Sequence, residues 1–372
     1  MSHDTYDAAV IGAGPAGATV AILLAKKGHR VVVADRSRFP RKQASTDWLN
    51  RQAKDLLAEL NVAGKPLLHR PFHDVTFYSA DLSKIAKPNF AEAPGYLIDR
   101  SAFDNALVEA VIAAGVTLLQ GSAVTDIRLT ETSAVLTLAN KGKVEGRLLM
   151  LAPGKGSSLL DWCGLVRSGV NSPIWTAQVD AVFKRLSPAI KPRVDVVLGL
   201  DRKGSFGVWC VAEDRLSVSI NWLGERDEAV PALVNLCKTA FEHGAIPLDL
   251  SAQAATARLI PSPASEALDM DSHVGKHTLL IGDAGGFISA ASNEGIYPAM
   301  WSARIAAEVA DAALRTVHSQ DELMSFDSKW RLQMADYLRS PNTDIQFLLP
   351  LIFSNQPMAD RMGAAFFSGK NI

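Results

Sequence analysis

The sequence predicts an α/β fold in which a discontinuous parallel-sheet domain contains an inserted antiparallel sheet and is followed by a helical C-terminal segment. Three stretches support this prediction. Residues 6–35 have the pattern strand, glycine turn, helix, strand; residues 170–224 alternate polar with apolar side chains; and residues 278–314 return to a buried strand and a long helix. Because a helical crossover joins parallel strands and alternation is typical of a half-buried antiparallel sheet, the second pattern interrupts the first.

The N-terminal unit consists of short runs with clear boundaries. An apolar run over residues 6–11 predicts a strand, and a stretch rich in Ala and Leu over 16–27 predicts a helix that ends at Gly28. A β-branched run over 30–34 predicts a second strand, which ends at Asp35. This order is the crossover expected of a parallel sheet.

The rest of the chain continues these two patterns. Amphipathic spacing predicts helices over 48–60 and 101–114, and the tail from residue 321 is expected to be helical. Strands are expected at 116–119, 123–129, 134–138, 144–152, 174–183, 194–198, 207–212, 216–222 and 278–281, and a long helix from about 295 to 314. The predicted domains are residues 1–70, 96–165 and 270–320 for the parallel-sheet domain, 71–95 and 166–269 for the inserted domain, and 321–372 for the helical segment.

Composition narrows the class of protein. The 372 residues are 48% hydrophobic and 21% charged with a net charge of −1, so nothing favours nucleic acid or an anionic membrane surface as a partner. The three cysteines show no metal-ligand spacing, which favours a reducing cytoplasm and no bound metal. No charged leader precedes the first strand, and the apolar run over 347–353 is too short to span a bilayer. We therefore expect a cytoplasmic protein without a transmembrane segment.

The clearest site motif is the glycine turn Gly12-Ala13-Gly14-Pro15-Ala16-Gly17. Gly12 permits the tight turn, Gly14 lets the backbone approach a pyrophosphate, and Gly17 allows the helix to pack closely on the strand. The helix that begins there directs its free N–H groups and its positive dipole end at the phosphates. Asp35 ends the next strand, where a carboxylate can accept hydrogen bonds from ribose hydroxyls. These residues predict a bound dinucleotide and leave open whether it is FAD or NAD.

Further motifs resemble a known flavoprotein family. The stretch Ile281-Gly282-Asp283-Ala284-Gly285-Gly286-Phe287 is similar to the second flavin fingerprint of the p-hydroxybenzoate-hydroxylase-type flavoproteins. The continuation Asn293-Glu294-Gly295-Ile296-Tyr297-Pro298-Ala299-Met300 most resembles the geranylgeranyl-reductase branch, as do Phe206-Gly207-Val208-Trp209 and Val218-Ser219-Ile220. The resemblance extends from residue 6 to about residue 315 and includes the order and spacing of the motifs. It implies a Rossmann-like FAD-binding domain and an FAD-dependent oxidoreductase.

The resemblance also implies which residues contact the cofactor. Gly282 and Asp283 are expected at the ribityl and pyrophosphate groups, and the backbone of Val124 at adenine. Gly295 and Ile296 begin a helix whose N-terminus can stabilise negative charge on a reduced flavin. The expected cofactor-binding residues are Gly12, Gly14, Pro15, Ala16, Gly17, Asp35, Arg36, Arg41, Lys42, Arg100, Val124, Gly282, Asp283, Gly295 and Ile296.

Basic residues in two segments each allow a second interpretation. Arg41 and Lys42 follow Phe39-Pro40, where relatives place a cation along the ribityl and phosphate groups; a solvated loop cation is the alternative. Arg100 begins an Arg-x-x-Phe-Asp sequence that ends at Asp104 and resembles the start of a helix in the family. The alternative for Arg100 is a buried structural ion pair with that aspartate.

Three departures from the branch lie where a substrate would meet the flavin ring. Ala44-Ser45 replaces Cys-Gly, residues 290–293 replace Pro-x-x-Gly, and Pro153-Gly154-Lys155-Gly156-Ser157 with Leu160 replaces Asp-Gly before a Ser and an Arg. The catalytic residues are therefore unknown from the sequence. Ser45, Asn293 and Trp209 are the pocket candidates, Trp209 because its strand resembles one that faces the flavin in relatives.

The branch resemblance implies reduction of a carbon–carbon double bond in a hydrophobic small molecule. Hydroxylation dependent on NAD(P)H and O2 is the alternative, because the scaffold is shared and the departures surround the ring. A halogenase fits less well, since a Trp-x-Trp-x-Ile-Pro signature is absent, and a non-enzymatic flavin-binding protein is a further alternative. No second glycine fingerprint is present, so NAD(P)H is expected to bind transiently, and a reductant protein is the other electron source.

Overall fold

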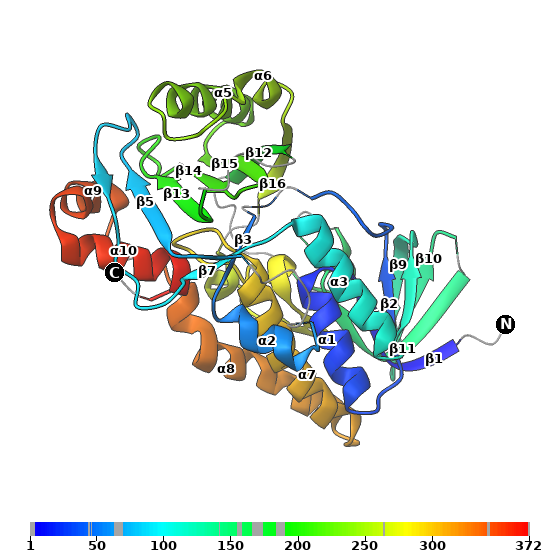
Figure 1. Ribbon diagram of the computed structural model, residues 1–372. Coiled ribbons are helices and arrows are strands. Elements are labelled where there is room, and N and C mark those ends of the chain that lie inside the picture. Colours follow the sequence, from blue (N-terminus) through cyan, green and yellow to red (C-terminus); the bar gives the residue numbers. More distant parts are fainter. Residues whose placement is uncertain are drawn as a thin grey trace.

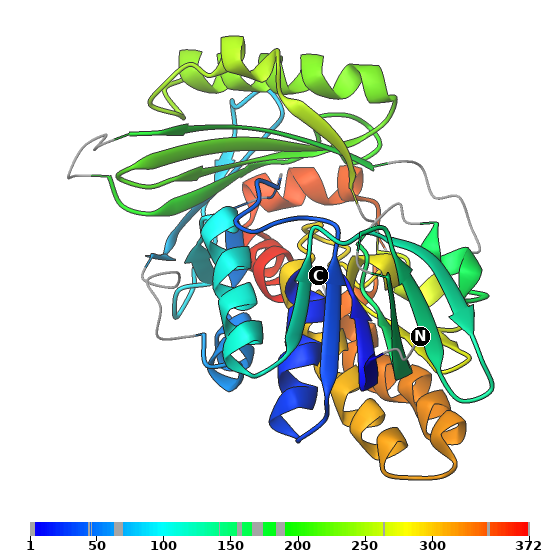
Figure 2. The same ribbon diagram turned by 90° about the vertical axis from the view of Figure 1, so that its right-hand side faces the viewer.

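The computed structural model describes residues 4–43, 45, 47–62, 70–140, 142–154, 158–165, 174–183, 190–262, 265–340 and 343–370. Two large sheets organise these residues (Figures 1 and 2). The sheet that contains the N-terminal strands lies at the lower right of Figure 1, and the second sheet lies above it with two helices on its outer side. The C-terminal helices lie at the left of that view, beside the second sheet.

The first sheet is centred on β1 (Asp4–Ile11), which pairs in parallel with β2 (Val31–Asp35) and β11 (Gly142–Leu151). Helix α1 (Pro15–Lys26) connects β1 to β2, which confirms the predicted crossover. The strand order is β17-β18-β11-β1-β2-β8, and β10 and β9 continue antiparallel from β11. The other bounds are β8 Thr117–Gln120, β9 Val124–Leu129, β10 Ala134–Leu138, β17 Val274–Gly275 and β18 Thr278–Leu280.

Helices cover this sheet and bury its apolar residues. Helix α1 packs against α3 (Arg100–Ala113) and α7 (Ile296–Leu314), and α8 (Ser319–Leu338) packs against α7. Helix α7 begins just after Gly295, so Pro298 lies in its first turn, where its missing N–H removes no helical hydrogen bond. The short helix α4 spans Leu159–Trp162.

The segment after residue 47 differs from the prediction of one helix over 48–60. Residues Trp48–Asn50 form β3, which pairs with β7 (Gly95–Leu97), and only Ala53–Glu59 form a helix, α2. Strand β4 (Pro71–Phe72) completes this small sheet. The indole of Trp48 is buried against two phenylalanines of the last helix. Pairing and packing with distant segments therefore override the local helical pattern.

The second sheet has the order β16-β12-β15-β14-β13-β5-β6 and is antiparallel except where β13 meets β5. Alternate residues of its central strands pack beneath α5 (Arg226–Glu242) and α6 (Ser251–Ala254), while the intervening polar residues face the first sheet. The bounds are β5 Asp74–Tyr78, β6 Ile85–Ala86, β12 Ile174–Val182, β13 Arg193–Val197, β14 Phe206–Val211, β15 Arg215–Leu223 and β16 Arg258–Ser262.

The C-terminal helices α9 (Ile345–Ser354) and α10 (Gln356–Ser368) pack on the second sheet, where Phe366 and Phe367 join its core. The α/β fold with an inserted antiparallel sheet and a helical C-terminal segment is thus confirmed. The exact domain boundaries stay a prediction. None of the helices in the described part of the chain has the length and apolar character needed to cross a membrane.

Candidate functional site

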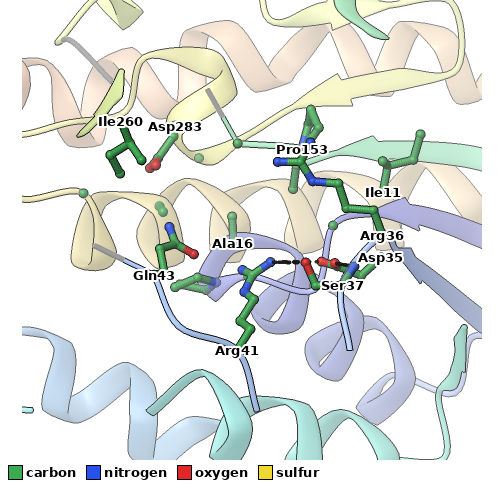
Figure 3. A pocket seen from close by; sticks show the side chains of 18 of the residues that line it. Ile11, Ala16, Asp35, Arg36, Ser37, Arg41, Gln43, Pro153, Ile260 and Asp283 are labelled. Carbon is green, nitrogen blue, oxygen red and sulfur yellow. Dashed lines mark hydrogen bonds and ion pairs between the residues drawn. The ribbon is translucent and has the colours of Figure 1, made fainter. Parts of the chain in front are cut away.

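A cavity of about 880 Å³ extends from the carboxyl ends of β1 and β2 to the polar face of the second sheet. In Figure 3, Asp35, Ser37 and Arg41 lie on one side of it, and Ile260 and Asp283 on the other. The sequence-predicted residues that line it are Gly12, Gly14, Pro15, Ala16, Asp35, Arg36, Arg41, Lys42, Ser45, Arg100, Val124, Gly282, Asp283, Asn293, Gly295 and Ile296. Segments from both ends of the chain therefore meet at one cavity.

At two glycines of the N-terminal turn a side chain would clash with the backbone, whereas at the third it would only occupy open space. A Cβ at Gly12 would collide with the carbonyl oxygen of Ala152, and one at Gly17 with the carbonyl oxygen of Gly12. At Gly14 the nearest atom to an added Cβ is Nη2 of Arg41, at 3.5 Å. Gly12 and Gly17 therefore satisfy the packing of the chain on itself, whereas Gly14 leaves open space that faces a cation.

Asp35 stabilises the turn as well as facing the cavity. Its Oδ2 accepts a hydrogen bond from the Ala13 backbone N–H at 2.7 Å, and its Oδ1 accepts one from the Ser37 N–H at 2.7 Å. The side chain is only 5% exposed, and the nearest cation, Nη1 of Arg41, lies 3.6 Å from Oδ2. Each carboxylate oxygen keeps a further lone pair that can accept a ligand hydroxyl.

Two arginines are held at the cavity by one buried carboxylate. Asp104 is fully buried; its Oδ1 lies 2.8 Å from Nε of Arg100, and its Oδ2 lies 3.4 Å from Nε of Arg41. The guanidinium of Arg41 also lies over the ring of Phe39, 4.7 Å from its centroid. Burial alone would lower the pKa of Arg100. The negative charges of Asp104 and Asp283 raise it by more than burial lowers it, so the guanidinium stays charged. Arg100 therefore both forms the buried ion pair with Asp104 and lines the cavity.

The start of α7 holds a carboxylate that the sequence interpretation missed. Oε1 of Glu294 accepts hydrogen bonds from the backbone N–H groups of Ile296 at 2.7 Å and Tyr297 at 2.9 Å. Glu294 lines the cavity, yet it is 2% exposed, and burial raises its pKa from 4.5 to about 7. Two N–H groups of this helix end are therefore already bonded within the chain.

Two consecutive hydrogen bonds, through Gln178 to Asp47, position the backbone of Ser45. Its backbone N–H donates to Oε1 of Gln178 at 2.8 Å, and Nε2 of Gln178 donates to Oδ2 of Asp47 at 2.6 Å. Burial raises the pKa of Asp47 to about 7, although Arg215 opposes this. Sequence reasoning found Ser45 but neither of its supports, because Gln178 comes from a distant strand. Ala44 and residues 155–157 lie outside the described residues.

A second cavity of about 490 Å³ adjoins the first. Of the described residues, Asn221 and Asn293 line both cavities. The apolar side chains of its wall come from the second sheet and the C-terminal helices: Ile174, Leu198, Phe206, Leu223, Leu348 and Met362. The exposed residues Lys203 and Thr343 mark where this cavity meets solvent.

Trp209 does not belong to this site, which corrects its assignment as a pocket wall. Among the described residues that line either cavity, Trp209 is absent, and it is fully buried in the core beneath α5. Its Nε1 donates to Oδ2 of Asp195 at 2.8 Å. Side chains alternate along β14, so Phe206 faces the second cavity while Trp209 points to the opposite face.

Comparison with known proteins agrees with this architecture. Residues 7–49 match a family of FAD dependent oxidoreductases. Digeranylgeranylglycerophospholipid reductase 2 of Methanosphaera stadtmanae is 24% identical over 364 residues, covering 93% of this chain and 88% of the relative. The corresponding reductase of Methanocaldococcus jannaschii is 22% identical over 342 residues, covering 91% of this chain and 85% of the relative.

Solved structures show the same fold. A geranylgeranyl bacteriochlorophyll reductase-like protein from Thermoplasma acidophilum superposes with a TM-score of 0.74 at 17% identity, covering 99% of this chain and 97% of that one. A flavin-dependent brominase superposes with a TM-score of 0.71 at 17% identity, covering 98% and 94%. Reductases and halogen-transferring enzymes therefore share this scaffold.

The chain is an FAD-dependent oxidoreductase. Over most of its length it is similar to digeranylgeranylglycerophospholipid reductases, and its fold is that of a geranylgeranyl bacteriochlorophyll reductase-like protein.

Proposed function

We propose that this enzyme reduces a carbon–carbon double bond in a hydrophobic small molecule, with FAD in the first cavity and the substrate chain in the second. The observation that carries the proposal is the junction of the two cavities at Asn221 and Asn293. At these two residues, a cofactor-sized cavity with polar and charged walls meets a smaller cavity that has many apolar side chains in its wall. That arrangement brings an apolar chain to one end of a bound cofactor.

The residues of the first cavity fit FAD. In our proposal the open space at Gly14 admits the pyrophosphate, and Arg36, Arg41 and Lys42 supply positive charge beside it. Asp35 accepts hydrogen bonds from the ribose. Arg100, Gly282 and Asp283 would lie along the ribityl chain, Val124 at adenine, and Gly295 and Ile296 toward the ring.

FAD, once reduced, supplies a hydride equivalent, and reduction of a double bond adds that hydride and one proton. The protein's part is to orient the substrate, to exclude water and to manage the proton. The buried carboxyl of Glu294, whose pKa is about 7, can hold a proton at the cavity wall near neutral pH. The apolar side chains that line part of the second cavity can hold a hydrocarbon chain.

The substrate class follows from the second cavity and from the relatives. Several relatives are named for a digeranylgeranylglycerophospholipid, and the apolar walls suit a hydrocarbon chain. Reducing equivalents come from NAD(P)H bound transiently or from a reductant protein. The buried thiols Cys163, Cys210 and Cys237 suit a reducing compartment such as the cytoplasm.

Hydroxylation with O2 is the second candidate, and one observation favours it. Ala44-Ser45 stands where the reductase branch carries Cys-Gly, so the reductase chemistry would lack that thiol, and Ser45 lies at the wall of the cavity. Oxygen then takes the place of the double bond as the electron acceptor.

Anaerobic reoxidation separates the two candidates. Holoprotein reduced without oxygen is mixed with a panel of unsaturated isoprenoid compounds that includes a digeranylgeranyl glycerophospholipid, and the absorbance of oxidised flavin is followed. We expect at least one compound to restore the oxidised spectrum in the absence of oxygen. If none does, and aerated buffer with NAD(P)H gives an oxygenated product instead, the hydroxylase candidate replaces the reductase.

A further inference from the structure

Four polar side chains separate the two cavities, and we call them the amide partition: Thr176, Asn221, Ser262 and Asn293. Nδ2 of Asn293 donates to Oδ1 of Asn221 at 3.0 Å and to Oγ of Ser262 at 2.7 Å. Oγ1 of Thr176 donates to the same Oδ1 of Asn221 at 3.0 Å. Three of the four are at most 6% exposed. A hydrogen-bonded polar cluster therefore lies where an apolar substrate would reach the cofactor.

The backbone explains why asparagine can occupy position 293. Asn293 has φ of 54°, in the left-handed region that glycine occupies without strain and asparagine tolerates best among other residues. The surrounding turn is closed by backbone hydrogen bonds from Asn293 to Ser289 and from Ser289 to Glu294, both 2.9 Å. Where the branch has glycine, this chain thus keeps the turn and adds a carboxamide to the partition.

Asn221 carries an unused hydrogen-bond donor. Oδ1 of Asn221 accepts two hydrogen bonds, one from Thr176 and one from Asn293. Its Nδ2 has no acceptor among the described residues, although the side chain is 1% exposed. A buried N–H without a partner is destabilising, because it loses its bond to water and gains none. At a residue that lines both cavities, a bound ligand can supply the missing acceptor.

We propose that the amide partition selects a substrate whose reacting double bond is conjugated to a carbonyl group, and that Nδ2 of Asn221 donates a hydrogen bond to the carbonyl oxygen. This inference rests on the proposed function and adds which double bond is reduced. The hydrocarbon chain lies in the second cavity, and the oxygen-bearing end reaches the partition. Internal double bonds carry no acceptor, so placing one there would leave Nδ2 of Asn221 without a partner.

For an α,β-unsaturated carbonyl compound the chemistry balances as follows. The β-carbon would receive the hydride equivalent that reduced FAD supplies, the carbon–carbon π bond would be lost, and the α-carbon would receive the proton that the carboxyl of Glu294 can hold at the cavity wall. During hydride transfer, negative charge develops on the carbonyl oxygen. A donor directed at that oxygen stabilises the transition state more than the ground state. Asn221 therefore favours reduction at the oxygen-bearing end of the chain.

Two isoprenoids test the inference: farnesal, whose aldehyde is conjugated to one double bond, and farnesene, a hydrocarbon of the same chain length. Binding to oxidised holoprotein is measured from the change in flavin absorbance and by equilibrium dialysis. We expect farnesal to bind about tenfold more tightly, the gain for one hydrogen bond to an otherwise unpaired donor. After turnover, mass spectrometry and NMR should show that only the double bond conjugated to the aldehyde is reduced.

The variant Asn221→Leu removes the donor at similar volume. It should weaken farnesal binding about tenfold and leave farnesene binding and FAD content unchanged. If this variant does not retain FAD, Asn221→Asp makes the same comparison, because it replaces the donor with an oxygen at the same position. In Asn293→Gly, which suits the left-handed backbone and keeps Asn221, the preference for farnesal should survive.

The outcomes separate this inference from the proposed function. Equal affinities for farnesal and farnesene, reduction of the internal double bonds, or an Asn221→Leu variant that still prefers farnesal would overturn the role of Asn221. A preference lost in Asn293→Gly but kept in Asn221→Leu would do the same. If neither compound nor any other alkene reoxidises the reduced holoprotein without oxygen, the proposed function itself fails.

Discussion

The two ends of the first cavity are built in different ways. At the glycine turn, backbone groups and one carboxylate from residues 12–37 form the wall, all within one crossover. At the amide partition, Thr176, Asn221, Ser262 and Asn293 come from four separate segments. The first end depends on local chain geometry, which sequence motifs encode. The second depends on how two sheets meet, and there the chain departs from its branch.

The largest expected effect is loss of the cofactor at the glycine-turn end. Gly14→Val fills the space in which we place the pyrophosphate, while its Cβ lies 3.5 Å from the nearest atom, so the fold should survive. We expect purified protein without bound FAD but with an unchanged circular dichroism spectrum. Ala58→Val, on the exposed side of α2, is the matched control and should load FAD normally. Normal loading of the Gly14 variant would show that the pyrophosphate lies elsewhere.

Glu294→Gln tests the other end through the pH dependence of stability. The folded-state pKa of Glu294 is about 7, above its ordinary 4.5, so the folded protein binds more protons than the unfolded chain between these values. Its contribution to stability is therefore present at low pH and lost as pH rises through about 7. Relative to the glutamine variant, wild-type protein should lose about 3 kcal/mol in the free energy of unfolding across that window.

The measurement is urea unfolding of both proteins at matched FAD concentration and at several pH values. Glutamine keeps an oxygen that can accept from Ile296 and Tyr297, so any constant offset reports the hydrogen bonds and only the slope reports ionisation. Asp47, whose pKa burial also raises to about 7, contributes equally to both curves. Parallel curves would show that Glu294 does not titrate in this range.

Asp35→Ala should cause a smaller loss that is divided between stability and cofactor affinity. The variant removes the acceptor of the buried Ala13 N–H and of the half-buried Ser37 N–H, which costs about 1–3 kcal/mol in the free energy of unfolding. FAD affinity should fall as well, and isothermal titration calorimetry measures it. Asp35→Asn, which keeps one acceptor oxygen, should lie between the two. If FAD affinity stays unchanged while stability falls, the carboxylate serves the turn alone.

The smallest effect is expected at Trp209, which lies outside both cavities. Trp209→Phe removes a hydrogen bond to Asp195 beneath α5 and should cost about 1 kcal/mol of stability. FAD content and ligand affinity should equal those of the wild type. A changed affinity for substrate would restore Trp209 as a pocket residue.

The contrast between the two ends also explains what the sequence could predict. The crossover and its glycines were predictable because each depends on neighbours within a few residues. The helix expected over 48–60 was wrong at its start, since Trp48–Asn50 pair with Gly95–Leu97. No local pattern contains that pairing.

The site shows the same division. Apart from Gly17 and Trp209, the site residues named from the sequence line one cavity, whereas their roles in binding FAD stay a prediction. Gln178 and Asn221 act through partners from distant segments and carry no motif of their own. Two signals were available in the sequence. Glu294 belongs to the stretch 293–300 that resembles the reductase branch, and Ser217, Ser219 and Asn221 are polar residues that alternate with apolar ones along β15.

A crystal structure of the holoprotein with FAD tests most directly whether the cofactor joins these two ends. We predict the pyrophosphate at Gly14 beside Arg41, and the flavin ring at the opposite end, in contact with the amide partition. The second cavity should then open onto the ring at Asn221 and Asn293. A ring located near Val124, or one separated from the second cavity by intervening chain, would contradict this arrangement.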